Sequence, residues 1–501
     1  MAVGDPRSIA TGSLAPVVCT SCKSRKQKCD KSLPSCSRCK RLLLKCDYPA
    51  PALSRQPPNE LNRDSNGGSL ASPNKPEASR EQVLKQDFDI LQHESFPDLA
   101  RMNEIFIKHK GQLVDLADVF LSSCQRWVHI VHPDMFRERC NTIRFEISHD
   151  YFALLVSMGM VSRPFLDGSA PDALRLTMYA TVKKLFWEMV PLAQPTLCLV
   201  QAGLLLSVYE YGQGLLNASY ITISACVGMA QILGLCAVQP PPLPQLGTLK
   251  PQDEGLQTWW GIMIHERMIS LKSGIYIKPL AFYSPDSMEN ESLEEKLRSI
   301  IPQINIDSHY PCFYLQARAA IWLDRVLDVI RSPGTATPEG RIRLQNLDRG
   351  LLIFLRLLVQ LGMGTCCEAI AIGLKWRFNS NDSFISTKQD KIESSQAIET
   401  ILNVLTDIST DEVAKKKGGS NEWMLGEIFP YTVDTIYQLV LEMRERKRLA
   451  YQTIVDPITD ARNASPAFET QVNMLRYILE KQTMRWQISH EFLESLDSIP
   501  S

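Results

Sequence analysis

The chain has 501 residues and a net charge of −1, with 45% hydrophobic and 22% charged residues. Its first sixteen residues contain no apolar core, which argues against a secretory signal peptide and hence against a disulfide-forming compartment. The charge is distributed unevenly. Residues 19–46 carry nine basic residues and one acid, a side-chain charge of +8, and the rest of the chain sums to −9. This asymmetry predicts a polyanion-binding head on an acidic body.

Six cysteines lie within twenty-eight residues, and the spacing Cys-x2-Cys-x6-Cys occurs twice among them. They are Cys19, Cys22, Cys29, Cys36, Cys39 and Cys46. A structural Zn²⁺ takes four ligands in a tetrahedron, and a Cys-x2-Cys pair supplies two of them from one turn of backbone. Two such pairs predict two metals. Since two tetrahedra need eight sulfur positions and six thiolates are present, two cysteines must bridge both ions, and we expect two Zn²⁺ per chain.

These cysteines allow three other interpretations. A disulfide framework requires a secretory context, for which the sequence gives no sign. A thioredoxin-like redox motif requires one Cys-x2-Cys rather than two with matched third cysteines. One zinc with spare thiols is the third alternative, and metal analysis separates it from a two-zinc cluster.

Residues 19–46, CTSCKSRKQKCDKSLPSCSRCKRLLLKC, resemble the fungal zinc binuclear cluster (Zn2Cys6) family of DNA-binding transcription regulators. The resemblance implies two four-cysteine sites that share Cys19 and Cys36 as bridging ligands. The remaining ligands it implies are Cys22 and Cys29 for one zinc, and Cys39 and Cys46 for the other. Pro34 lies where the family has the proline of the loop that joins its two halves.

The family reads DNA with a short helix between its second and third cysteines, which corresponds to residues 23–28. Lysine or arginine side chains there can pair with the O6 and N7 acceptors of guanine. By position, Lys26 is the expected base reader with Arg25 beside it, whereas Lys23 and Lys28 are expected to hold phosphates. The resemblance implies a CGG-type half-site, and DNA affinity should fall steeply with salt because neutralised phosphates release counterions.

A proline-rich segment follows the cysteines. Residues 47–80 hold six prolines, a Gly-Gly and few large apolar side chains, so we expect a disordered tether. Many cluster proteins place a dimerising coiled coil after such a linker. The only candidate here is Leu84, Phe88 and Leu91, and two turns fall short of the three to four heptads that a coiled coil requires. We expect at most a short helix before residue 95, and a homodimer through this segment is not supported.

Beyond residue 96 the apolar residues recur at helical spacing and strand-like alternation is scarce. The expected fold is therefore a small Zn2Cys6 domain, a disordered linker and a large all-α domain, since this length suffices for one large or two medium domains. The expected boundaries are an arm at 1–18, the zinc cluster at 19–46, the linker at 47–95, and helical regions at 96–290 and 291–501.

Three passages within residues 110–275 resemble the middle homology region of the same fungal regulators. They are a His-Pro turn at His132 and Pro133, a Gly-x-Ala-x-x-Leu-Gly-Leu run from Gly228 to Leu235, and a Trp-Trp helix at Trp259 and Trp260 followed by Glu266 in place of the usual aspartate. Their order behind the cysteine-rich head implies that the helical body belongs to the same kind of regulator.

Several features of the body have simpler explanations than a functional one. Residues 221–238 are uncharged and just long enough to span a membrane, but their polar content favours a buried helix. His129 and His132 lack a third ligand, so packing or capping is expected. The other eight cysteines lack ligand spacing and are expected to be buried side chains. They are Cys124, Cys140, Cys198, Cys226, Cys236, Cys312, Cys366 and Cys367.

The last residues allow two interpretations. Residues 486–497 mix acidic with bulky apolar side chains, which is typical of amphipathic activation segments. Ile488, Phe492 and Leu496 are also spaced as the buried stripe of a final helix. Both interpretations stay open at this point.

The chain lacks a phosphate loop, a nucleophile elbow and a zinc-protease helix, so we expect no enzyme and no catalytic residue. The resemblance implies a nuclear regulator of RNA polymerase II genes that binds double-stranded DNA and the transcription machinery or co-regulators, with no membrane association. Control of a secondary-metabolite gene cluster and a small-molecule effector are further expectations. The alternatives are a zinc-stabilised nucleic-acid or protein interaction module without sequence specificity, and a metabolite-binding or catalytic helical protein with a DNA-binding head.

Overall fold

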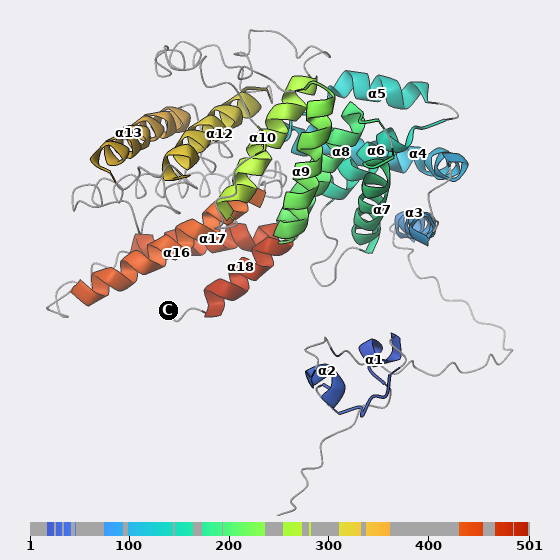
Figure 1. Cartoon of the computed structure of the whole chain (residues 1–501), viewed down its shortest axis with the longest axis horizontal. Helices are drawn as coiled ribbons and strands as arrows, with labels where there is room; N and C mark the ends of the chain where they lie inside the picture. Colours follow the sequence, from blue (N-terminus) through green and yellow to red (C-terminus); the bar gives the residue numbers. More distant parts are fainter. Residues whose placement is uncertain are drawn as a thin grey trace, which may run out of the picture. The chain divides into compact units, whose positions relative to one another are not determined.

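The protein is described from a computed structural model, shown in Figure 1, and its contacts divide the chain into two units, Met1–Ser72 and Pro73–Ser501. The structure describes residues 18–24, 27–32, 35–41, 46, 75–93, 99–143, 146–163, 173–192, 194–235, 254–272, 280–281, 310–331, 337–360, 430–453, 466–483 and 485–498. The expected arm at 1–18, apart from its last residue, and the expected tether as far as residue 74 lie outside these ranges. The finer domain boundaries stay predictions.

The first unit contains two one-turn helices, α1 (Thr20–Ser24) and α2 (Ser37–Arg41). Helices of five residues are not stable alone, because the first turn fixes several residues for one hydrogen bond. Among the described residues of this unit, the buried side chains around which they pack are cysteines. The fold of this unit therefore depends on its cysteine cluster.

The second unit is helical throughout its described residues, and no strand occurs in them, which confirms the expected all-α body. Its helices are α3 (Lys75–His93), α4 (Leu99–Ser122), η1 (Cys124–Arg126), α5 (Pro133–Thr142), α6 (His149–Ser162), α7 (Ala173–Met189), α8 (Leu197–Gly212), α9 (Leu216–Ile232), α10 (Glu254–Lys272), α12 (Tyr310–Arg331), α13 (Pro338–Gln360), α16 (Pro430–Thr453), α17 (Pro466–Gln482) and α18 (Gln487–Ser498).

Helix α8 lies at the centre of this body and packs against α6, α7, α9 and α10 (Figure 1). Its N-cap is Thr196, whose Oγ1 accepts a hydrogen bond from the backbone N of Leu199 at 3.2 Å. From Leu199 to Gly212 every side chain is buried. Because α8 is apolar on nearly all sides, it can only be stable with neighbours all round it.

Residues 221–232 of the uncharged segment that raised a membrane interpretation lie in helix α9, which packs on α8. Thr222 Oγ1 donates to the Glu210 carboxylate at 2.8 Å, and Ser224 Oγ donates to the carbonyl of Tyr220 at 2.7 Å. These bonds use the polar side chains that argued for a buried helix. None of the described helices is long and apolar enough to cross a membrane.

Helix α3 has nineteen residues and is longer than the short helix expected before residue 95. Its apolar face packs on other helices of the body, which stabilises the longer helix. Leu84, Phe88 and Leu91 are 1%, 0% and 1% exposed and belong to the core of the body, where α3 packs on α7 and α4. The stripe that sequence patterning assigns to a weak coiled coil is thus occupied within the same chain.

Polar contacts also fix α3 to the body. Asp87 lies 8% exposed between two side chains of α4, with its Oδ2 at 2.7 Å from Lys108 Nζ and at 2.7 Å from His109 Nε2. Arg163 Nη2 donates to Glu81 Oε2 at 2.8 Å. Because a buried carboxylate is stable only when it is paired, these bonds make α3 part of the body rather than an appendage.

Motif residues of the body have structural roles. His132 caps α5 by accepting from the backbone N of Met135 at 3.4 Å, with Pro133 at the first helical position. Trp259 and Trp260 are both fully buried. The carboxylate of Glu266, further along the same helix, accepts hydrogen bonds from the backbone N of residues 280 and 281 at 2.6 Å and 3.0 Å. These bonds hold residues 280 and 281 against α10.

The final helix, α18, packs onto the body through α16 and α17. Ile488 and Leu496 are buried, and Phe492 stacks on Tyr437 with ring centroids 4.0 Å apart. The apolar residues of the candidate activation segment therefore form the packed stripe of a terminal helix. Trp486, just before the helix, is fully buried.

Candidate metal centre and nucleic-acid interface

Four cysteine side chains converge in the first unit. Cys19, Cys22, Cys36 and Cys39 are at most 2% exposed, and their Sγ atoms all lie within 4.8 Å of one another. The Sγ atoms of Cys19 and Cys22 lie 3.7–3.9 Å from those of Cys36 and Cys39. Sulfurs that sit about 2.3 Å from a tetrahedral zinc are separated by about 3.8 Å. The geometry therefore fits thiolate coordination of zinc.

The remaining two cysteines lie at the edge of this group and are half-buried. The Sγ of Cys29 is 3.8 Å from the Sγ of Cys19, and the Sγ of Cys46 accepts from the backbone N of Cys36 at 3.3 Å. All six predicted cysteines are thus brought together. This supply of six sulfur ligands exceeds what one tetrahedral ion takes and matches two ions with shared ligands.

Two members of the cluster lie at its centre. Cys19 contacts Cys22, Cys29, Cys36, Cys39 and Cys46 through its thiol. Cys36 likewise contacts each of the other five. A ligand that belongs to both tetrahedra must touch every other ligand. Cys22 Sγ also lies 3.9 Å from Cys39 Sγ, although the resemblance gives these two ligands to different ions. The assignment of Cys19 and Cys36 as the bridges therefore stays a prediction.

The two halves of the cluster are built alike. The backbone N of Lys23 donates to the carbonyl of Cys19 at 3.0 Å, and the backbone N of Lys40 donates to the carbonyl of Cys36 at 3.0 Å. Each Cys-x2-Cys pair thus opens a one-turn helix, α1 or α2, with a lysine four residues after the first cysteine. The pseudo-symmetry expected from the repeated spacing is present in the backbone.

Burial raises the pKa of the Cys19 and Cys39 thiols above the ordinary value. Zinc binds the thiolate form and releases the proton, so the ion offsets the cost of burying these groups. Metal affinity at such a site falls in acid, because protons compete for the same sulfurs. The head therefore gains its fold and its metal together.

The predicted DNA-contacting residues are placed in part. Lys23 and Lys28 are exposed, as phosphate contacts require. Arg25 and Lys26, the expected base readers, lie outside the described residues. Helix α2 adds two exposed basic residues, Lys40 and Arg41. They are not among the predicted DNA contacts, which all lie in the first half. The signal for them was the repeat itself, because Lys40 occupies the position in the second half that Lys23 has in the first.

A conformational feature marks the turn after the third cysteine. Lys31 has φ of 62°, in the left-handed region that costs a side chain with a Cβ about 1–2 kcal/mol. We expect Lys31→Asn to keep the stability of the cluster, since asparagine tolerates this region, and Lys31→Val to lose about 1 kcal/mol or more. Both variants remove the same ammonium group, so the pair isolates the backbone effect. Thermal unfolding of the zinc-loaded head checks it, and equal stabilities would contradict it.

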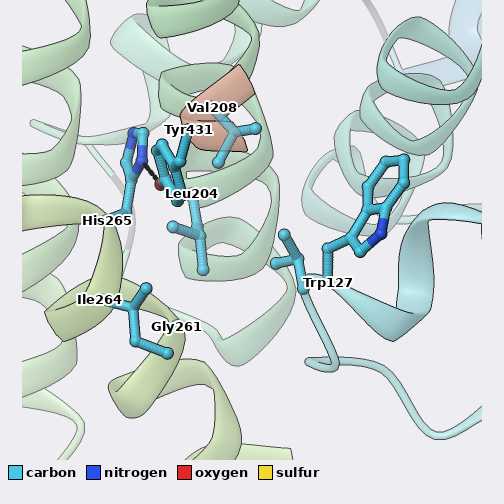
Figure 2. Close-up of a pocket in the computed structure, with 8 residues that line it drawn as sticks. Trp127, Leu204, Val208, Gly261, Ile264, His265 and Tyr431 are labelled. Carbon is cyan, nitrogen blue, oxygen red and sulfur yellow. Dashed lines mark hydrogen bonds between the residues drawn. The ribbon is translucent and has the colours of Figure 1, made fainter. Parts of the chain in front are cut away.

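The body contains a small cavity that bears on the catalytic alternative (Figure 2). Its volume is about 10 Å³, room for no more than one water molecule. It is lined by Trp127, Val128, Leu204, Val208, Gly261, Ile264, His265 and Tyr431. Figure 2 shows His265 and Tyr431 bonded to each other at one end, with Trp127 at the other. This cavity is too small for a metabolite.

His265 at this cavity is a buried structural group. Its Nε2 lies 2.8 Å from Ser207 Oγ and 3.3 Å from Ser219 Oγ, and its Nδ1 bonds to the Tyr431 hydroxyl. Burial lowers the pKa of His265 to about 3, so the ring is neutral at physiological pH. No carboxylate lines this cavity to form an acid–base pair with it. The cluster ties α8, α9, α10 and α16 together.

The geometry defines a class of protein: a small basic metal–thiolate head joined to a helical body. Residues 17–55 match the fungal Zn(2)-Cys(6) binuclear cluster domain. The head is therefore a Zn2Cys6 domain, which binds two zinc ions and is typical of DNA-binding transcription regulators. Among curated proteins, none matches the chain.

Proposed function

We propose that the chain is a nuclear, sequence-specific DNA-binding regulator of genes transcribed by RNA polymerase II, and that its head reads CGG-type half-sites. The observation that carries the proposal is the cluster of buried cysteine sulfurs at zinc-tetrahedron spacing within a segment of charge +8. The match of residues 17–55 to the fungal cluster domain supports the same conclusion. A metal-folded basic head has the charge to bind phosphates and the rigidity to hold side chains at base edges.

In this proposal the first zinc is held by Cys19, Cys22, Cys29 and Cys36, and the second by Cys19, Cys36, Cys39 and Cys46. Zinc supplies structural cross-linking rather than catalysis. Lys23 and Lys28 hold phosphates, and Lys26 with Arg25 reads bases. The body is the part that contacts co-regulators or the transcription machinery, takes up any effector, and acts without enzymatic activity. Control of a secondary-metabolite gene cluster rests on resemblance alone.

Substitution of two lysines tests base reading against simple charge. Lys26→Ala should weaken binding to a CGG duplex by about 1–3 kcal/mol and relax specificity, because it removes guanine contacts. Lys23→Ala is the matched control and should weaken all sequences alike while reducing the salt slope by about one ion. Titration of CGG and scrambled duplexes at several salt concentrations measures both effects.

The outcome also separates the main alternative. A zinc-stabilised module without sequence specificity would bind CGG and scrambled duplexes equally, and its affinity would depend only on salt. Equal losses on both duplexes for Lys26→Ala would remove this residue from base reading.

Assembly on DNA follows from the docking of α3. Because Leu84, Phe88 and Leu91 are buried in the body, they cannot also pair two copies of the chain unless α3 leaves its site. We expect the full chain to sediment as a monomer at micromolar concentration. An inverted repeat of the half-site should gain no more than about twofold in affinity over a single one, since no second head is linked to the first. Cooperative binding of two chains to the repeat would contradict this.

A further inference from the structure

Asp30 is the one acid among the residues from Cys19 to Cys46, where nine bases surround it. A carboxylate in a DNA-binding head repels phosphates and opposes the counterion release that drives binding. Electrostatics alone would therefore favour its replacement by a neutral residue. Its contacts suggest that it has a structural task that offsets this cost.

The Asp30 carboxylate caps helix α2. Both of its oxygens lie 3.1 Å from the backbone N of Ser37, the first residue of α2, and the Ser37 hydroxyl donates to Oδ2. The chain turns sharply after Asp30, since Lys31 is in the left-handed region. This turn brings the carboxylate back to a residue seven positions further along the sequence. A helix of one turn depends on such a cap, because most of its backbone N–H groups have no partner within the helix.

The same carboxylate lies where the two halves of the cluster meet. Asp30 follows Cys29, which belongs to the first half, and bonds to Ser37, which follows Cys36 at the start of the second. A carboxylate oxygen of Asp30 and the sulfurs of Cys29 and Cys36 all lie within 4.8 Å of one another. Asp30 is thus a direct link between the halves that does not pass through a cysteine.

We propose that Asp30 is a positioning residue for DNA reading: by tying α2 to the end of the first half, it fixes the orientation of the first half, which reads bases, relative to the exposed Lys40 and Arg41 of α2. The inference rests on the proposed function and concerns the same head. It assigns the carboxylate neither to zinc nor to DNA. The residue acts through the geometry of the cluster.

Two substitutions that remove the same charge separate positioning from electrostatics. Asp30→Asn keeps an acceptor oxygen for the backbone N of Ser37, and Asp30→Ala keeps none. We expect Asp30→Ala to bind a CGG duplex at least about threefold more weakly than the native chain, despite its extra positive charge. Asp30→Asn should bind at least as tightly as the native chain, because it keeps the cap and gains charge. Ser37→Ala, which leaves the charge unchanged, should lie between the native chain and Asp30→Ala.

The measurements are made on the full chain, with zinc content and the rate of zinc release to an excess of chelator as second readouts. Two zinc ions in each variant and faster release from Asp30→Ala than from Asp30→Asn support positioning. Equal DNA affinities for Asp30→Ala and Asp30→Asn would overturn the proposal. So would a loss of zinc from Asp30→Ala, because Asp30 would then be needed to hold the metal rather than to orient the DNA-reading half. If the native chain fails to prefer CGG, the proposed function fails, and the two release rates alone decide on positioning.

Discussion

Removal of zinc from the intact chain is expected to abolish DNA binding and to leave the helical body folded. The described residues of the head have a core of cysteine side chains and two helices of five residues, so its fold depends on the metal. The body has its own core of apolar side chains, from Leu84 to Leu496, in a separate unit. Metal analysis should give two zinc ions per chain, and circular dichroism after chelation should show the helical signal largely retained.

Substitution of single cysteines tests the arrangement within the cluster. Cys36→Ala removes a central thiol that contacts all the others and should release both zinc ions. Cys46→Ala removes an edge thiol and should leave one tetrahedron complete. Both variants lose DNA affinity, but they differ in zinc content. One zinc per native chain, or equal zinc contents in the two variants, would contradict a binuclear cluster bridged at Cys36.

The metal site was predictable because its geometry is local. Metal–ligand distances fix which sulfur spacings are usable, and a Cys-x2-Cys pair places two ligands from a single turn, so the sequence spacing alone identifies the chemistry. Spacing rules of this kind did not identify a role for the second half of the head. The role of Asp30 depends on a turn at Lys31 and on a contact with a residue seven positions away. No spacing rule predicts either feature.

The helical content of the body was also predictable, whereas the partner of each apolar stripe was not. Leu84, Phe88 and Leu91 have the spacing of a coiled coil and equally that of a packed helix. What decides between them is the surface of α7 and α4, which lies far along the chain. The buried charges are a second example. Arg175 is fully buried because it donates to the carbonyl of Arg485, 310 positions later, and no local pattern shows that acceptor.

The terminal segment should prove essential for the stability of the body. Trp486 is fully buried, and the Arg175 guanidinium lies 5.7 Å from its ring. The neighbouring residue, Arg485, donates from Nη2 to the carbonyl of Ser162 at 2.7 Å. The residues before α18 are therefore held by core helices that lie more than 300 positions earlier in the chain. We expect Trp486→Ala to lower the free energy of unfolding by about 3–5 kcal/mol, as burial of a large aromatic side chain predicts. Denaturant unfolding of the full chain measures it.

The glycine opposite this tryptophan provides a sharper test, because the two residues should compensate for each other. A Cβ at Gly212 would lie 2.2 Å from Cε3 of Trp486, so Gly212→Ala alone should destabilise the body. In the Trp486→Ala background the clash disappears, and the same alanine should be tolerated. Leu192→Ala, at a side chain that is 77% exposed, is the control and should change stability by less than about 0.5 kcal/mol. A stable chain lacking residues 486–501 that binds DNA but activates a reporter poorly would instead restore the activation interpretation, because a segment needed only for output is not needed for folding.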